Sequence, residues 1–361
     1  MNRGWAAAVM SACTIAVLSS AWSGSAWAST EQASAKAPAS RVLVMPFETS
    51  TREPRSYWLG EGSSVILSDS LLALGLPVMR REERLHSFDL LRVPVVAGLS
   101  RATIIRVGQV VGASQIIVGT FTLKGDILTV RASAIHLDTG LAGTEIVESG
   151  PLADIFNIYD RVAVRLVPGS SPAAVPMDSH PPIAAFEQFI KGLIAEMPAT
   201  KLSFLNEAVR LAPGLQRARI AAWDTYTDLG EHDRALAAVR QVPASHRLTR
   251  QARFLASVSL LELKRYQEGF GGLTRLNGEE KDVTLLNNLG VVQLRRPPGN
   301  QGARAVFYFN DAASLEGVDS YFNLGYAYWL DGDASAAVLW LREAVRRNPA
   351  DHAAHFVLGV A

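Results

Sequence analysis

The sequence predicts two domains, in which an α/β (or α+β) amino-terminal domain with helices on a mixed sheet precedes an all-α solenoid. In the first half, hydrophobic residues alternate between strand-like and helix-like spacing, whereas the second half keeps helical spacing throughout. In addition, a Leu-Gly pair occurs at 289–290, 324–325 and 358–359, with spacings of 35 and 34 residues. A period of about 34 residues is typical of stacked helical hairpins.

The composition is that of a globular protein with balanced charge. The 361 residues are 48% hydrophobic and 19% charged, and the formal net charge is +1 at pH 7. This balance argues against a nucleic-acid-binding surface that dominates the chain. The length accommodates two domains and a targeting segment.

Residues 1–28 are predicted to be a cleaved signal peptide. Arg3 gives a positive start, Trp5 to Leu18 is mostly apolar, and Ala26-Trp27-Ala28 matches an A-x-A cleavage site. Cleavage after Ala28 would remove the single cysteine, Cys13, and with it any disulfide or thiol chemistry. We therefore expect a periplasmic or secreted protein, soluble after export, with peripheral envelope association as an alternative.

Residues 29–40 are small and polar with alanine, and predict a flexible tether. Residues 41–168 are predicted to form the α/β domain. Branched apolar runs indicate its strands, and Lys124-Gly125-Asp126 indicates a hairpin turn. The expected elements are strands at 41–47, 77–80, 115–123, 127–137 and 141–149, and helices at 57–74, 100–111 and 152–166, while residues 81–99 are ambiguous.

The stretch Gly60-Glu61-Gly62-Ser63-Ser64 is interpreted as a loop that caps the first helix, with Ser63 or Ser64 as the cap. A phosphate-binding loop is the weaker interpretation, because the stretch has no basic residue and Glu61 would repel phosphate. A small-ligand or enzymatic site near Glu48, Glu61 and the strand ends remains an alternative.

Four stretches of this domain resemble the TolB amino-terminal-like domains. Those domains in turn resemble curli-assembly and flagellar-assembly lipoproteins. The four stretches are Val42 to Phe47, a strand that ends in Pro-Phe; Tyr57 to Gly62; Val110 to Phe121; and Ala134 to Gly140. The resemblance implies an α/β fold in a bacterial protein, often ahead of helical repeats. It implies no shared catalytic residues.

Five prolines between Val167 and Pro182 predict a semi-extended domain linker at 169–182. Residues 183–361 are then predicted to form about five helical hairpins and a partial sixth. The clearest hairpin runs from Asp319 to Pro349, with a break at Asp331-Gly332-Asp333 in which Asp333 caps the second helix. Its anchors are Tyr321, Leu324, Gly325, Tyr328, Ala337, Leu341, Ala344 and Pro349. The small residues Gly325 and Ala337 are expected to let the two helices approach closely.

These anchors resemble the tetratricopeptide repeat pattern. The resemblance implies that the first helix of each hairpin lines a concave groove, which binds an extended peptide or a partner's helix. The implied groove residues are Arg217, Asp224, Asn287, Val291, Phe322, Tyr326 and Trp329. An alternative is that a following repeat or the amino-terminal domain covers the rings.

Motifs for zinc proteases, nucleophile elbows and P-loops are absent from the sequence. His352 and His355 share a helical face, but a metal site needs further ligands, and His355 is expected to be a packing residue. The sequence therefore predicts no catalytic residue, cofactor or metal. It predicts an exported, non-enzymatic scaffold that binds a protein or peptide partner and no nucleic acid, in an envelope assembly.

Overall fold

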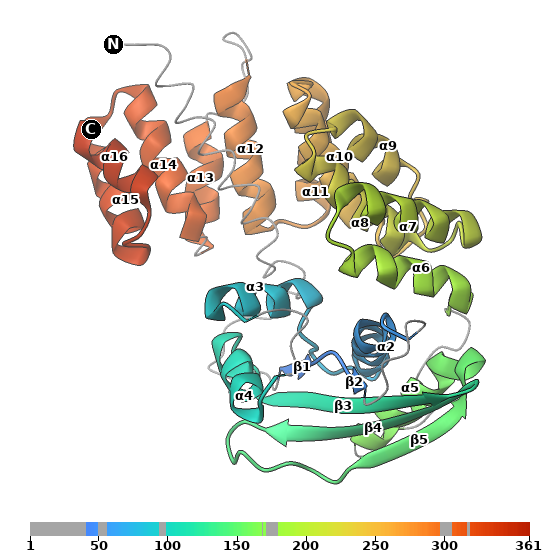
Figure 1. Ribbon diagram of the computed structural model, residues 1–361. Coiled ribbons are helices and arrows are strands. Elements are labelled where there is room, and N and C mark those ends of the chain that lie inside the picture. The colour runs from blue at the N-terminus through green and yellow to red at the C-terminus, as the bar shows by residue number, and fades with distance from the viewer. Residues whose placement is uncertain are drawn as a thin grey trace. The chain divides into compact units, whose positions relative to one another are not determined.

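The computed structural model describes residues 41–49, 56–93, 99–167, 169–170, 180–296, 305–315 and 318–361. The chain divides into two compact units, with the boundary between Ala218 and Arg219. The fold class is confirmed: a small mixed sheet with helices is followed by a solenoid of helical hairpins (Figure 1). The predicted signal peptide, the tether and most of the linker lie outside the described residues.

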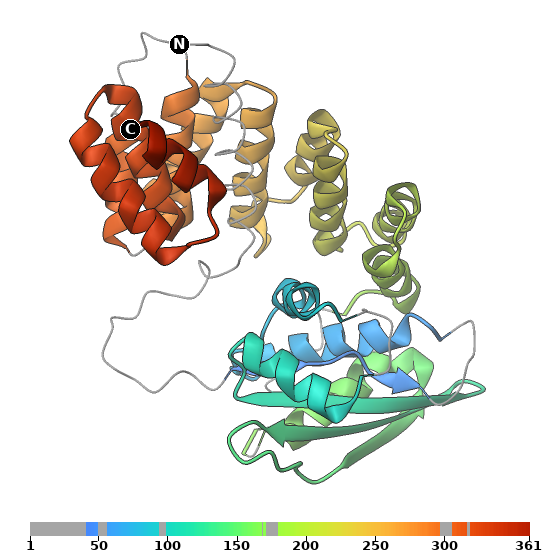
Figure 2. The same cartoon turned by 60° about the vertical axis from the view of Figure 1, so that its left-hand side comes forward.

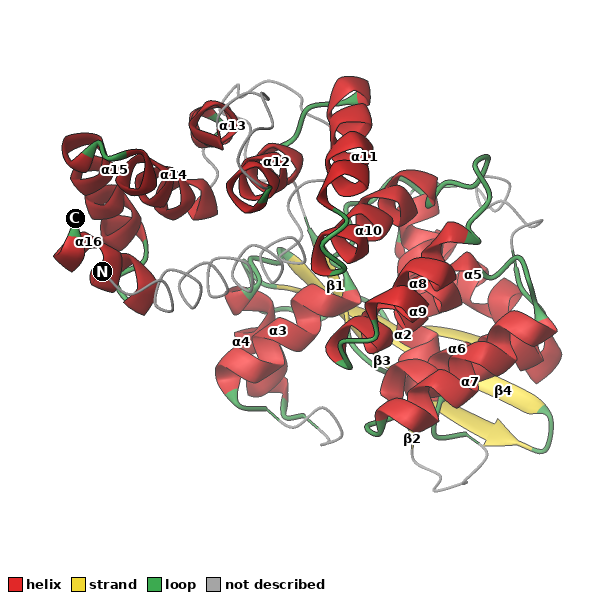
Figure 3. Ribbon diagram, turned by 90° about the horizontal axis from the view of Figure 1, so that it is seen from above, coloured by secondary structure: helices red, strands yellow, loops and turns green. Residues whose placement is uncertain are grey.

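The sheet, whose strands are yellow in Figure 3, lies in the unit that ends at Ala218. Its order is β1 (Val42–Val44), β3 (Gln115–Lys124), β4 (Ile127–His136) and β5 (Ile146–Pro151). β1 and β2 (Glu48–Thr49) both run parallel to β3, whereas β3, β4 and β5 are antiparallel. The predicted hairpin is confirmed, since Lys124 pairs with Ile127 across the turn.

Four helices cover this sheet: α2 (Leu59–Ala73), α3 (Arg81–Leu91), α4 (Arg101–Val110) and α5 (Ile155–Leu166). α5 packs on β4 and β5, and its apolar stripe of Ile155, Ile158 and Val162 is fully buried. A second core joins strand residues Leu43 and Ile116 to Phe88 of α3. Alternation along the strands and helical spacing along α5 therefore produce layers of helix on sheet.

Several helix and strand boundaries predicted within this domain are wrong. Ser63 and Ser64 lie inside α2, where their hydroxyls donate to the carbonyls of Leu59 and Glu61, so neither caps the helix. The expected strand at 77–80 is reduced to one bridge between Val78 and Val42. The ambiguous stretch contains α3, and the last strand begins at Ile146 rather than at 141.

Beyond the sheet, the described residues from 183 onward form helices joined by turns. α6 (Ile183–Ile194) and α7 (Pro198–Leu211) pack as a hairpin in the first compact unit. The later hairpins α12–α13 and α14–α15 lie side by side (Figure 1, Figure 2). The remaining elements are α8 (Gln216–Asp228), α9 (His232–Arg240), α10 (Thr249–Glu262), α11 (Tyr266–Glu279), α12 (Val283–Arg295), α13 (Ala305–Ser314), α14 (Val318–Asp331), α15 (Ala334–Arg347) and α16 (His352–Val360).

Two sequence features of the α14–α15 hairpin are confirmed. Asp333 caps α15, because its carboxylate accepts the N–H of Ala336 at 3.0 Å. Gly325 lets the helices approach closely, since a Cβ at this position would lie 2.7 Å from the Leu341 side chain. The cap and the close approach together fix how α14 presents its remaining faces.

Candidate functional site

The glycine that packs on the second helix gives a common reference point in three hairpins. Gly192 of α6, Gly290 of α12 and Gly325 of α14 face Leu205, Phe309 and Leu341. At about 100° per residue, the positions six and three before this glycine, and one and four after it, share one side of the helix. We call these positions the inner stripe. In α12 they are Thr284, Asn287, Val291 and Leu294, and in α14 they include Phe322, Tyr326 and Trp329.

Three aromatic rings form a continuous row along the inner stripe of α14. The ring centroids of Phe322 and Tyr326 lie 6.1 Å apart with planes 12° from parallel, and those of Tyr326 and Trp329 lie 5.7 Å apart at 29°. Phe322 is 7% exposed and Tyr326 is 1% exposed, whereas Trp329 is partly exposed. Phe322 and Tyr326 are therefore packed inside the fold, and Trp329 is the accessible ring of the row.

A pair of asparagines joins the inner stripe of α12 to α14. The Asn323 amide donates to the side-chain oxygen of Asn287 at 2.9 Å, and both residues are buried. Sequence reasoning selected Asn287 but missed Asn323. The available signal was the recurrence of Asn-Leu-Gly at 288–290 and 323–325, of which only the Leu-Gly pair was used.

The structure thus brings five of the seven predicted groove residues together. Val291 belongs to the same buried cluster as Phe322 and Tyr326, with Leu294 and Trp329 packed against it. Asn287 is tied to this cluster through Asn323. The result is a buried, largely apolar cluster across α12 and α14 that contains one amide pair and has the partly exposed Trp329 packed against it.

The other two predicted residues lie elsewhere. Asp224 is exposed on α8. Arg217 lies before the unit boundary and forms an ion pair with Asp69 of α2. The guanidinium of Arg217 therefore holds the start of α8 to the α/β domain.

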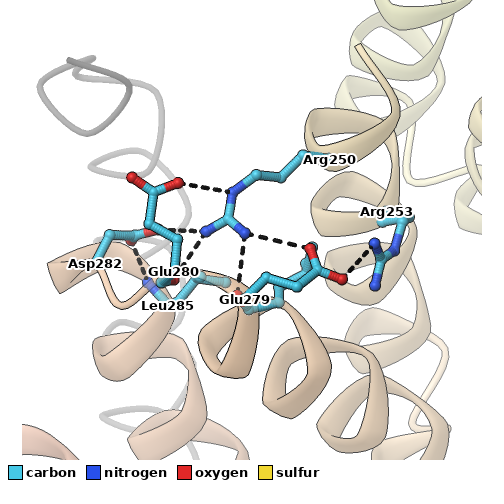
Figure 4. Close-up of polar contacts among 7 residues, drawn as sticks. Arg250, Arg253, Glu279, Glu280, Asp282 and Leu285 are labelled. Carbon is cyan, nitrogen blue, oxygen red and sulfur yellow. Dashed lines mark hydrogen bonds and ion pairs between the residues drawn. The ribbon is translucent and has the colours of Figure 1, made fainter. Parts of the chain in front are cut away.

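An arginine clamp positions α12 (Figure 4). Arg250 of α10 donates to the carbonyls of Leu276 and Glu280 at 3.0 and 2.9 Å, and it pairs with Asp282 at 3.5 Å. Asp282 caps α12 by accepting the N–H of Leu285 at 2.8 Å. Burial raises the pKa of Asp282, and the Leu285 hydrogen bond and the Arg250 charge offset only part of this rise. One side chain thus fixes the α11–α12 junction and the start of the inner stripe on α12.

At the alternative ligand or enzymatic site near Glu61, the structure has a group of ion pairs between α2 and α3. Glu61 lies inside α2, not in a loop as predicted, and its carboxylate accepts from Arg81 at 2.7 Å and from Arg84 at 2.5 Å. Burial alone would raise the pKa of Glu61, but the two guanidiniums outweigh it and hold this pKa below its ordinary value. Arg84 is 3% exposed and also donates to the carbonyl of Val44 and the hydroxyl of Ser64. Glu61 therefore joins α2 to α3, while Glu48 is exposed on β2.

Two further observations concern only the described part of the chain. It contains no group of three or more His, Cys, Asp and Glu side chains arranged to hold a metal ion. None of its helices has both the length and the apolar character of a membrane span. The expected packing role of His355 is wrong, because this residue is exposed and its Nε2 contacts the carbonyl of Pro349 at 3.0 Å.

Comparison with known proteins gives a family match for the α14–α15 hairpin. A family model described as tetratricopeptide repeat matches residues 318–351. The structure of YrrB, "a TPR protein with an unusual peptide-binding site", is 15% identical and aligns over 48% of this chain and 91% of its own, with a TM-score of 0.38. A thermophilic TPR protein in Thermus thermophilus is 16% identical over 45% and 89% of the two chains, also with a TM-score of 0.38.

The carboxy-terminal domain of LpoB from Salmonella enterica is 14% identical and aligns over 31% of this chain and 83% of its own, with a TM-score of 0.27. No curated protein matches the chain. The resemblance of residues 41–168 to TolB amino-terminal-like domains stays a prediction.

Proposed function

Because residues 318–351 are a tetratricopeptide repeat within an array of helical hairpins, we propose that this chain is an exported, non-enzymatic adaptor. Its inner stripe on α12 and α14 binds a protein or peptide partner. The observation that carries the proposal is the stacked row of Phe322, Tyr326 and Trp329 beside the Asn287–Asn323 pair.

The aromatic row supplies the energetic part of the proposed contact. Trp329 is partly exposed, so it is the ring of the row that can bury further area against a partner, and it loses little conformational freedom because it has two side-chain torsions. Residues that dominate binding energy are enriched in Trp and Tyr and lie at the centre of an interface. Tyr326, which is 1% exposed, stacks between Phe322 and Trp329 and so supports the Trp329 ring from inside the fold.

Export and an envelope role rest on separate support. The signal-peptide features of residues 1–28 support export. The TolB-like resemblance of residues 41–168 supports a place in a bacterial envelope assembly, where the α/β domain provides a second interaction surface. Neither feature names the partner.

Affinity capture from envelope extract tests the proposed adaptor role. The bait is the full chain, compared with Trp329→Ala and with the control Leu339→Ala, which removes an apolar side chain that is 65% exposed on α15. Captured proteins are quantified by mass spectrometry. We expect at least one protein to be captured by the parent and the Leu339→Ala chain and lost with Trp329→Ala. Capture that is identical for all three chains would contradict the proposal.

A further inference from the structure

The two edges of the sheet in the α/β domain are closed in different ways. At the β1 edge neighbouring backbone takes part, because the Val42 N–H donates to the carbonyl of Pro77 at 3.0 Å and the Met79 N–H donates to the carbonyl of Val42 at 2.8 Å. β5 forms the other edge (Figure 1), and among the described residues it pairs with β4 alone. A bare edge strand of this kind offers unpaired backbone groups to another strand.

The register of β5 shows which of its backbone groups point away from the sheet. Just past β5, the Leu152 N–H donates to the carbonyl of Asp126 at 2.7 Å. In an antiparallel ladder, hydrogen-bonded pairs of this kind alternate with pairs that make no backbone bonds to each other. Counted back along the β4–β5 register, Glu148 turns its backbone N–H and C=O toward β4, whereas Val147 and Ser149 turn theirs outward. The edge therefore presents the backbone groups of Val147 and Ser149 to an added strand.

Two arginines of α5 occupy the carbonyl oxygens on this edge. Arg165 donates to the carbonyl of Val147 at 3.0 Å and to the carboxylate of Glu148 at 2.8 Å. Arg161 donates to the same carboxylate at 2.9 Å and makes a longer contact of 3.4 Å with the carbonyl of Ser149. The two arginine side chains are 44% and 50% exposed, whereas that of Glu148 is 16% exposed. Glu148 thus anchors two guanidiniums that lie across the outward side of β5.

Glu148 also carries the negative charge of this group. Burial would raise the pKa of its carboxyl, but the hydrogen bonds and charges of Arg161 and Arg165 outweigh burial and keep this pKa below its ordinary value. If a second β5 strand were added antiparallel, with Val147 opposite Ser149, the two Glu148 residues would face each other with Cα atoms about 4.5 Å apart. Like charges placed directly opposite each other destabilise strand pairing.

We propose that Glu148, Arg161 and Arg165 form an edge cover that keeps a second copy of this chain from adding its β5 to the sheet. The guanidiniums occupy the carbonyl acceptors that an added strand needs. The two glutamates repel each other once the guanidiniums are displaced. The edge cover controls self-assembly of the α/β domain, which is separate from the adaptor role proposed for the helical hairpins.

The test opens the edge cover by substitution in the full chain. The opened variant combines Glu148→Thr, Arg161→Ala and Arg165→Ala, which removes both guanidiniums and the repelling charge and leaves a residue that suits a strand. A second variant adds Val147→Pro to these three changes. Proline at this position removes an outward N–H and leaves the hydrogen bonds to β4 in place.

A charge-matched control removes the same kinds of side chain from helices α7 and α9. It carries Glu207→Ala, Arg210→Ala and Arg234→Ala. Sedimentation velocity at rising protein concentration measures self-association, and circular dichroism verifies that each variant is folded. Hydrogen exchange at residue resolution reports on the backbone of β5.

We expect the opened variant to form dimers beyond any self-association of the parent or the charge-matched control. Exchange at Ser149 should be at least about tenfold slower in these dimers than in the parent. Adding Val147→Pro should return the sedimentation to that of the parent. An opened variant that is folded yet sediments like the parent would overturn the edge cover. Dimers that persist with Val147→Pro, or that the charge-matched control also forms, would overturn it as well.

The parent chain supplies a second measurement, which does not depend on the folding of any variant. If the edge cover keeps other strands away, the N–H groups of Val147 and Ser149 should exchange like unprotected amides, while the N–H of Glu148, which faces β4, exchanges more slowly. Strong protection of Val147 and Ser149 in the parent would overturn the proposal, because these groups would then already be paired.

Discussion

Changing Asn323 to Ala tests how firmly the inner stripes of α12 and α14 are joined. The change removes the Asn323 amide, which is the donor to the side-chain oxygen of Asn287 among the described residues, and leaves that oxygen buried without this hydrogen bond. The expected loss of folding free energy is about 1–3 kcal/mol. At about 1.4 kcal/mol per factor of ten, protected amides of α12 and α14 should exchange hydrogen about 5- to 150-fold faster.

Hydrogen exchange followed by mass spectrometry measures this effect locally, which avoids treating a chain of two compact units as one two-state system. The matched control is Asn288→Ala, because the Asn288 amide donates within α12, to the carbonyl of Thr284. The double change Asn287→Ala and Asn323→Ala removes both partners and should cost less than the sum of the two single changes. Strict additivity of the two costs would refute the assignment of this hydrogen bond.

Three further predictions concern packing and charge. Gly325→Ala should destabilise the α14–α15 hairpin by about 1–3 kcal/mol, because the added Cβ would lie 2.7 Å from the Leu341 side chain. The control is Gly271→Ala, whose added Cβ would meet no neighbouring element within 4 Å. Equal melting temperatures of the two variants would contradict the packing. The ion pairs hold the pKa of Glu61 in the folded chain below its ordinary value of 4.5, so Glu61 stabilises the fold above that pH and this stabilisation is lost as the pH falls through the folded-state pKa. In Glu61→Gln, the melting temperature should therefore depend less on pH between about pH 5 and about pH 3 than in the parent chain. The same pH dependence in both chains would refute this. Arg250→Ala should speed hydrogen exchange at the first turn of α12, because Arg250 pairs with Asp282, the cap of that helix. Arg253→Ala should have a smaller effect there, because Arg253 pairs with Glu279 of α11. The reverse order would contradict the clamp.

Local rules predicted the solenoid well. The Leu-Gly pair and the Asp331-Gly332-Asp333 break identify α14 and α15 because both follow from short-range geometry, a close helix approach and a helix cap. The Asn287–Asn323 bond has no such local cause, since its partners are 36 residues apart. The asparagines that recur before the Leu-Gly pair are Asn288 and Asn323, so the recurrence marks Asn323 but not its bond to Asn287.

Long-range contacts also explain the errors in the α/β domain. α2 begins at Leu59, before the serines expected to cap it, and the preceding Trp58 is held by its contact with Phe186, a residue far along the chain. α3 was ambiguous because its buried residues include Arg84 and Ser87 besides Phe88, so hydrophobic periodicity could not reveal it. Arg84 is buried only because Glu61 of another helix neutralises it.

Site-specific photo-crosslinking tests the central claim most directly. A photoreactive amino acid replaces Trp329 on the inner stripe in one full-length protein and Leu339 on α15 in another, and both are irradiated in envelope extract. An adaptor that binds through the inner stripe predicts a discrete crosslinked protein from position 329 and none of that mass from position 339. The same products from both positions, or none from position 329, would contradict partner binding at this surface.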